Sequence, residues 1–117
     1  MTTLRNLVKL SSCIEVFIPS TTNVNIENET EQAKQVENAQ KVFAELFGGA
    51  TTIKAVGSWV SPVHSIVNEN IVIVQSYCTT EQLNNGIDTV IRLVENVKSK
   101  MAQEAISLKV NNELYFV

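Results

Sequence analysis

Apolar and polar positions recur with clear periods along the chain, and these periods separate six segments. Between Cys13 and Ile18, successive side chains alternate between two faces, which predicts a strand. Pro19 ends this strand because proline cannot donate a hydrogen bond to a neighbouring strand. The stretch 20–30 is polar and rich in asparagine, and it predicts a loop.

A first helix is predicted from Asn28 to Phe47. Asn28 and Glu31 have the spacing of a helix cap with its reciprocal partner, and Gly48 and Gly49 end the helix because glycine accepts the left-handed conformation. Mostly apolar residues recur at helical spacing and define one face of this helix. Its members are Ala33, Val36, Ala39, Gln40, Phe43, Leu46 and Phe47.

Two further strands are predicted after this helix. In Thr51–Val60 two sets of side chains alternate, Ile53, Ala55, Gly57 and Trp59 against Lys54, Val56, Ser58 and Val60. A turn is expected at Ser61-Pro62, with residues 64–68 forming the rest of a hairpin loop. Asn70–Cys78 contains the run Ile71 to Val74, apolar on both faces. This run predicts a central strand, covered on both sides by its own chain or on one side by another subunit.

A second helix is predicted to begin at Thr79 or Thr80, where Thr79 and Gln82 have capping-box spacing. Its apolar stripe comprises Leu83, Ile87, Val90, Ile91, Val94, Val97 and Met101. After it, Asn111-Asn112 suits a two-residue turn between strands 106–110 and 113–117, since asparagine tolerates positive φ. One long bent strand is the alternative.

The order strand, helix, strand, strand, helix, strand predicts a ferredoxin-like α+β fold, with an antiparallel sheet, two helices on one face and an extra C-terminal strand. At 117 residues the chain is expected to form a single domain, 1–117. Residues 1–12, which include Leu4, Leu7, Val8 and Leu10, either extend the first strand or pack as an arm on a neighbour.

Composition and charge exclude several classes of protein. Twelve acidic against nine basic residues give a net charge of −3, which makes nucleic acid an unexpected partner. No apolar run approaches the roughly 18 residues of a membrane span, and no signal peptide is recognisable, so a cytoplasmic location is expected. Cys13 and Cys78 are expected to be reduced thiols; a disulfide between neighbouring strands is the alternative.

Candidate chemistry is sparse. His64 is the single histidine, and no phosphate-binding loop, dinucleotide fingerprint, nucleophile elbow or zinc motif is present. The sequence therefore predicts no catalytic residue, no cofactor and no metal site. For a ligand pocket it offers Trp59 as a stacking surface, His64 as a proton acceptor, Tyr77 as a hydroxyl and Arg92 as a cation.

The sheet face that the helices leave bare is expected to be apolar. Depending on register, it carries Phe17, Val56, Val60, Val72 and Val74, or their alternates. An uncovered apolar face marks an interaction site, so a homodimer or higher oligomer is predicted. The predicted interface residues are Phe17, Val72, Val74, Tyr115 and Phe116.

Three stretches resemble a group of small uncharacterised proteins carried by bacterial chromosomes, plasmids and phages. They are the run from Val42 to Thr51 through Phe47-Gly48-Gly49, the run Val56-Gly57-Ser58-Trp59-Val60 with Glu69 and 71–74 after it, and the ending 110–116. The resemblance implies the ferredoxin-like fold and no catalytic residue. By analogy it implies an accessory role, such as inhibiting a host system by binding a protein or small nucleotide.

These observations favour a non-enzymatic, oligomeric binding protein whose partner is a protein or a small molecule held at the subunit interface. The alternative is a small dimeric α+β-barrel enzyme with a pocket near Trp59 and His64, lined also by Tyr77 and Arg92.

Overall fold

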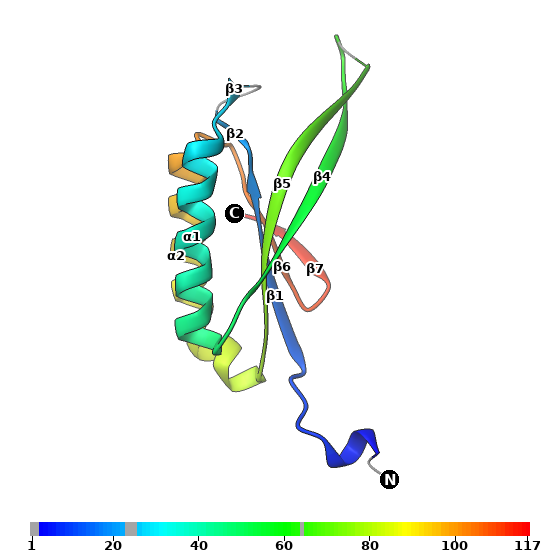
Figure 1. Ribbon diagram of the computed structural model, residues 1–117, viewed down its shortest axis with the longest axis vertical. Helices are drawn as coiled ribbons and strands as arrows, with labels where there is room; N and C mark the ends of the chain where they lie inside the picture. The colour runs from blue at the N-terminus through cyan, green and yellow to red at the C-terminus, as the bar shows by residue number, and fades with distance from the viewer. Residues whose placement is uncertain (1–2, 23–25, 64) are drawn as a thin grey trace.

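The computed structural model places two helices in one layer against one face of an antiparallel sheet (Figure 1), which confirms the predicted ferredoxin-like α+β fold. The structure describes residues 3–22, 26–63 and 65–117. Within them the elements are η1 (Leu4–Asn6), β1 (Ser12–Pro19), β2 (Thr21–Thr22), β3 (Ile26–Glu27), α1 (Glu29–Phe47), β4 (Thr51–Ser61), β5 (Ser65–Cys78), α2 (Thr80–Lys100), β6 (Ser107–Val110) and β7 (Glu113–Phe116).

The main sheet has the strand order β4-β5-β1-β6-β7, and every neighbouring pair is antiparallel. β1 lies inside the sheet between β5 and β6, while β7 forms an edge. Asn111 and Asn112 both have positive φ, 50° and 68°, and they turn β6 back into β7. The C-terminal hairpin is therefore confirmed, and the alternative of one bent strand is wrong.

Both helices begin where their caps predict. The side chain of Asn28 accepts a hydrogen bond from the backbone N–H of Glu31 at 3.1 Å, and α1 ends at Gly48 with φ 88°. Thr79 and Gln82 exchange reciprocal hydrogen bonds of 3.0 Å and 2.9 Å at the start of α2. These bonds satisfy backbone N–H groups that have no partner inside a helix.

Replacing Thr79 by alanine is expected to lower the free energy of unfolding by about 1 kcal/mol, because a backbone N–H loses its cap. Urea unfolding followed by circular dichroism measures the change. Thr80→Ala, at the next and equally exposed position, is the control and should change stability by less than about 0.5 kcal/mol. Equal losses in the two variants would show that the capping box does not stabilise α2.

The core lies between the helices and one face of the sheet. From β1 it takes Ile14, Val16 and Ile18, all fully buried, and Val16 pairs with the fully buried Val74 of β5. The two helices meet at Gly86, where an added Cβ would lie 3.2 Å from Phe47. The fully buried ring of Phe43 packs edge-on against Phe47 at 5.6 Å.

The strand hairpin β4–β5 is longer than the sequence predicts. Residues 64–68 were expected to form a loop, but β5 starts at Ser65, and Trp59 pairs with Val67. The turn expected at Ser61-Pro62 is shorter than predicted, and in Figure 1 the paired strands of the hairpin run past the helix layer. The predicted loop 20–30 likewise contains the short β2–β3 ladder.

The sheet face opposite the helices, here called the open face, has an apolar centre. Phe17 of β1 pairs with Ile73 of β5, which pairs on its other side with Ile53 of β4. The next row brings Ile71 beside Ala55. Three strands therefore present one continuous apolar surface that no element of the described chain covers.

Candidate functional site

Three of the four residues predicted to line a ligand pocket, Trp59, Tyr77 and Arg92, do not come together. Trp59 and Tyr77 share the open face, but their cross-strand positions on β5 lie ten residues apart, which is about 33 Å along a strand. Arg92 lies on α2, in the layer on the other side of the sheet, and donates to Thr89 Oγ1 at 3.2 Å. His64 lies outside the described residues.

The predicted interface residues divide between the two faces. Phe17 has the register of the open face. Phe116 pairs with Ser107 at the same register, but it also lines the hollow beside α2. Val74 is wrong as an interface residue, because it is fully buried in the core, and Val72 belongs to the same helix-facing set. Tyr115 pairs with Leu108 and lines a hollow beside α2.

The two cysteines are both free thiols. Cys13 pairs across strands with Tyr77 and lies on the open face, whereas Cys78 pairs with Ser12 and is fully buried on the helix side. Because their side chains lie on opposite faces, the alternative of a disulfide is wrong. Burial raises the pKa of both thiols, so neither is a ready thiolate nucleophile at neutral pH.

A polar cluster lies at the end of the open face nearest β2. The carboxylate oxygen Glu69 Oε1 accepts a hydrogen bond from Thr21 Oγ1 at 2.9 Å. Gln103 Nε2 donates to the backbone carbonyl oxygens of Thr21 at 2.8 Å and Met101 at 3.1 Å. These bonds tie β5, β2 and the segment after α2 together at one point.

This cluster borders a shallow recess of about 170 Å³. Its lining residues are Phe17, Pro19, Glu69, Ile71, Gln103, Ala105, Ile106 and Ser107. In the described part of the chain the single ion pair is that of Lys109 with Glu15, 3.9 Å, so Glu69 has no basic partner there. A carboxylate without a basic partner beside apolar and aromatic surface suits a cationic ligand.

Trp59 lies on the same face as Glu69 and close to it. Glu69 pairs with Gly57, and Trp59 is two residues further along β4, so the two side chains are diagonal neighbours about 7–8 Å apart. Gly57 has no side chain, and Ile71 Cδ1 covers it, 2.6 Å from the position that a Cβ would take. Trp59 is 42% exposed. The face therefore offers a carboxylate and an aromatic ring to one ligand.

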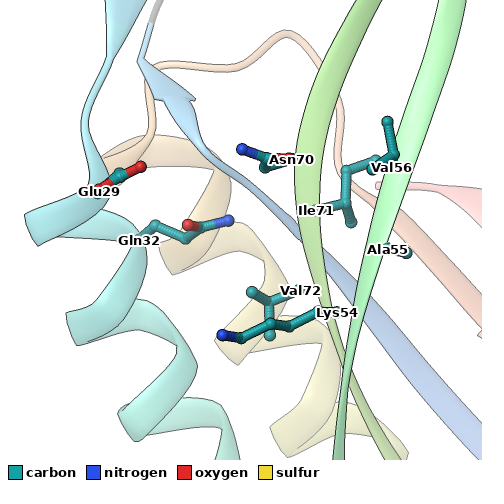
Figure 2. Close-up of a pocket in the computed structure, with 8 residues that line it drawn as sticks. All are labelled: Glu29, Gln32, Lys54, Ala55, Val56, Asn70, Ile71 and Val72. Carbon is teal, nitrogen blue, oxygen red and sulfur yellow. The ribbon is translucent and has the colours of Figure 1, made fainter.

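A second concavity lies on the opposite side of the sheet, between α1 and the β4–β5 hairpin (Figure 2). Its volume is about 460 Å³, and it continues along α1 into a hollow of about 410 Å³. Figure 2 shows Glu29 and Gln32 of α1 facing Lys54 and Asn70 of the sheet across this cleft. The buried amide of Gln32 donates to the carbonyl oxygen of Ile18 at 3.2 Å.

The two concavities differ in charge. The cleft of Figure 2 carries the carboxylate of Glu29 and the ammonium of Lys54, so its charges balance. The open-face recess carries the carboxylate of Glu69 without a cation. A singly charged cation is therefore attracted to the recess more strongly than to the cleft.

Sequence reasoning missed most of these groups. In the sequence Glu69 stands out only within the stretch that resembles the small bacterial, plasmid and phage proteins, and Thr21 and Gln103 give no signal. Their hydrogen bonds span 48 and 82 residues, so no local pattern joins them. Gln32 is the residue that the sequence could have indicated, because it is a polar residue on the side of α1 that is buried.

Comparison with known proteins gives matches by structure alone: no protein-family model and no curated protein sequence matches the chain. A phage SAM lyase in complex with S-methyl-5'-thioadenosine superposes with a TM-score of 0.66, at 12% identity, over 99% of this chain and 95% of the lyase. A phage SAM lyase in the apo state superposes with a TM-score of 0.62, at 14% identity, over 92% and 88% of the two chains.

A weaker similarity joins the chain to CutA from Synechococcus elongatus, with a TM-score of 0.46, at 16% identity, over 88% of this chain and 78% of CutA. The similarity to the phage enzyme corrects the sequence-based prediction of function. A non-enzymatic binding protein was predicted, and non-enzymatic function was favoured. Both predictions are wrong, since this architecture matches at nearly full length an enzyme that acts on SAM.

Proposed function

We propose that the protein is an enzyme that binds S-adenosylmethionine (SAM) on its open face and cleaves a carbon–sulfur bond of the sulfonium to release S-methyl-5'-thioadenosine. The observation that carries the proposal is the carboxylate of Glu69, which has no basic partner in the described chain and lies beside aromatic surface, on a fold that matches a SAM lyase at 99% coverage.

The chemistry of a sulfonium explains why such an enzyme needs few catalytic groups. The substrate can supply its own nucleophile: as the carboxylate oxygen of the amino-acid arm bonds to the carbon attached to sulfur and closes a lactone, the carbon–sulfur bond breaks. The bonding electron pair goes to sulfur, and the sulfonium becomes a neutral thioether. A neutral leaving group needs neither a proton donor nor a metal ion to depart. The main tasks left to the protein are to hold the arm in a reactive conformation and to exclude water.

Glu69 is suited to hold the charged arm of the substrate. The arm carries a sulfonium, an ammonium and a carboxylate, so its net charge is positive, and the Glu69 carboxylate attracts the two cationic groups. Trp59 and Phe17 add aromatic surface, which attracts cations and stacks on planar groups. Thr21 fixes one carboxylate oxygen at 2.9 Å and leaves the other for the ligand.

The recess is too small to enclose the substrate by itself. Its volume is about 170 Å³, whereas pockets that enclose small ligands measure about 300–1,000 Å³. A second copy of the chain packed on the open face would supply the missing wall and cover the apolar row from Phe17 to Ile53. The proposed enzyme is therefore a homo-oligomer whose site lies between subunits.

The proposal is tested by incubating the purified protein with SAM and separating the products by liquid chromatography. The expected result is S-methyl-5'-thioadenosine, formed in proportion to enzyme and time and above the slow spontaneous reaction. Formation of S-adenosylhomocysteine instead would indicate methyl transfer. Unchanged SAM at every enzyme concentration would refute the proposed activity.

The cleft of Figure 2 provides an internal comparison for the site. If the substrate lies there instead, Lys54→Ala and Glu29→Gln will lower the turnover of SAM, since both side chains line that cleft. If it lies in the open-face recess, both variants will keep the turnover of the unmodified protein. Neither residue contacts the recess.

No helix in the described part of the chain is long and apolar enough to span a bilayer.

A further inference from the structure

The segment before β1 exposes several apolar side chains. Leu4 is 87% exposed, Leu7 53% and Leu10 46%. Figure 1 shows this segment, residues 3–11, leaving the end of β1 and running away from the sheet. We call it the arm.

The three leucines of the arm are spaced three residues apart. A 3₁₀ turn and an extended polyproline-type helix both have three residues per turn. Leu4–Asn6 forms a 3₁₀ turn, and Leu7 after it is extended, with φ −100° and ψ 154°. With Val8, which is 95% exposed, the arm therefore presents four apolar side chains to solvent.

An apolar groove without an occupant lies between α2 and the C-terminal hairpin. It measures about 410 Å³, and its lining residues are Ile87, Ile91, Leu108, Val110, Tyr115, Phe116 and Val117. This volume lies within the range of about 300–1,000 Å³ of pockets that hold ligands. The adjoining strand β7 is an edge strand, whose free side offers backbone groups to an extended segment.

We infer that the arm of one copy of the chain docks in this groove of a second copy. Charge supports the pairing, because the arm carries Arg5 and Lys9 while Asp88 and Glu113 lie beside groove residues on α2 and β7. Those four charges have no ion-pair partner within the described residues. The exposed apolar side chains and the two basic residues of the arm thus match an apolar groove whose flanking charges, Asp88, Glu113 and the basic Arg92, sum to −1.

The arm is placed to reach a neighbour and not its own groove. Its root is fixed by two bonds to the β6–β7 turn: Cys13 N–H donates to Asn111 Oδ1 at 2.9 Å, and Asn111 N–H donates to the carbonyl of Cys13 at 3.0 Å. To enter the groove of its own chain, the arm would have to reverse at once. No glycine or proline between Leu4 and Ser12 provides such a reversal.

Cysteine cross-linking in the full-length chain tests the inference, with Cys13 replaced by serine throughout. One preparation carries Leu7→Cys and the other Tyr115→Cys, so a disulfide between them forms only between two chains. The mixture is oxidised and its cross-linked peptides are identified by mass. Glu95→Cys, exposed on α2 outside the groove, replaces Tyr115→Cys in the control mixture.

The expected result is a disulfide between residues 7 and 115 and none above background between 7 and 95. Equal yields in the two mixtures, or none in either, would overturn the inference. So would a chain carrying both Leu7→Cys and Tyr115→Cys that links only within itself. Because the groove is separate from the open face, these outcomes do not depend on SAM turnover.

A substitution without cysteines gives the second measurement. Leu7→Asp is expected to weaken association by about tenfold to a hundredfold, the effect of losing one buried leucine. Asn6→Asp introduces the same charge beside it without removing an apolar contact, and it should change association by less than about threefold. Light scattering across a concentration series gives both values. Equal weakening in the two variants would contradict docking of the leucine.

Discussion

Replacing Glu69 by glutamine is expected to lower kcat/KM for SAM about 100-fold while leaving the affinity for S-methyl-5'-thioadenosine within about threefold of the unmodified value. Losing one partner of a desolvated charge pair costs about 2–5 kcal/mol. S-Methyl-5'-thioadenosine is neutral and has lost the charged arm, so it has no charge for Glu69 to pair with. Steady-state kinetics and calorimetric titration measure the two effects.

Glu15→Gln is the matched control for this substitution. Glu15 also lies on the open face and is also partly buried, but Lys109 lies 3.9 Å from its carboxylate, and it does not line the recess. Its substitution is expected to leave kcat/KM within about threefold. An equal loss of kcat/KM with Glu15→Gln would show that Glu69 does not act through its charge on the sulfonium arm. A loss of affinity for S-methyl-5'-thioadenosine as large as the loss of kcat/KM in Glu69→Gln would show the same.

Replacing Ile73 by aspartate is expected to separate the subunits at the open face, so that only the arm contact remains, and thereby to lower the oligomeric mass and to abolish SAM turnover. Ile73 lies in the middle of the apolar row, between Phe17 and Ile53. A second subunit packed on that row would bury the new carboxylate without a partner, which raises the dissociation constant by roughly 1,000-fold or more. Light scattering at micromolar concentration gives the mass.

The control for folding and charge is Ala44→Asp, which places the same carboxylate on the exposed side of α1. Its mass and turnover should equal those of the unmodified protein. Both variants should retain the helical circular dichroism signal, because Ile73 faces away from the core. An Ile73→Asp protein that keeps the oligomeric mass would place the interface elsewhere. A variant of lowered mass that still cleaves SAM would separate the site from the interface.

Most of the fold could be predicted because each element carries its own local signal. The capping residues Asn28 and Thr79, the glycine at 48 and the asparagine pair 111–112 all act within a few residues of themselves. Such signals depend on backbone conformation and on hydrogen bonds to the nearest turn. These signals can therefore be recognised in the sequence without knowing which distant residues each element contacts.

The function was predicted wrongly for a physical reason. The motifs that a sequence displays most clearly are nucleophiles, metal ligands and phosphate loops, which are the groups that difficult leaving groups require. In the reaction proposed here the substrate arrives already activated, as a sulfonium, and one well-placed carboxylate with aromatic surface is the main requirement. A single glutamate in a strand gives no motif. The resemblance to small bacterial, plasmid and phage proteins stays a prediction.

The sequence by itself determined the order of the elements and their ends. It also determined that the strand at 71–74 has more apolar residues than one buried face needs. Only the tertiary structure decided which half of that strand is core. Because every position of the run is apolar, the sequence does not indicate which alternate side chains face the core. Pairing with β1 decides this: it buries Val74 against the helices and turns Ile71 and Ile73 to the open face.

The same pairing decided the candidate site. Glu69 lies two residues before Ile71 on β5, so its side chain points to the same open face. Folding brings Thr21 to Glu69 across 48 residues and Gln103 to Thr21 across 82 residues. A one-residue change of register would have turned the carboxylate to the helix side. Local sequence specifies elements through short-range backbone energetics, whereas register and long-range contacts arise only when the whole core packs.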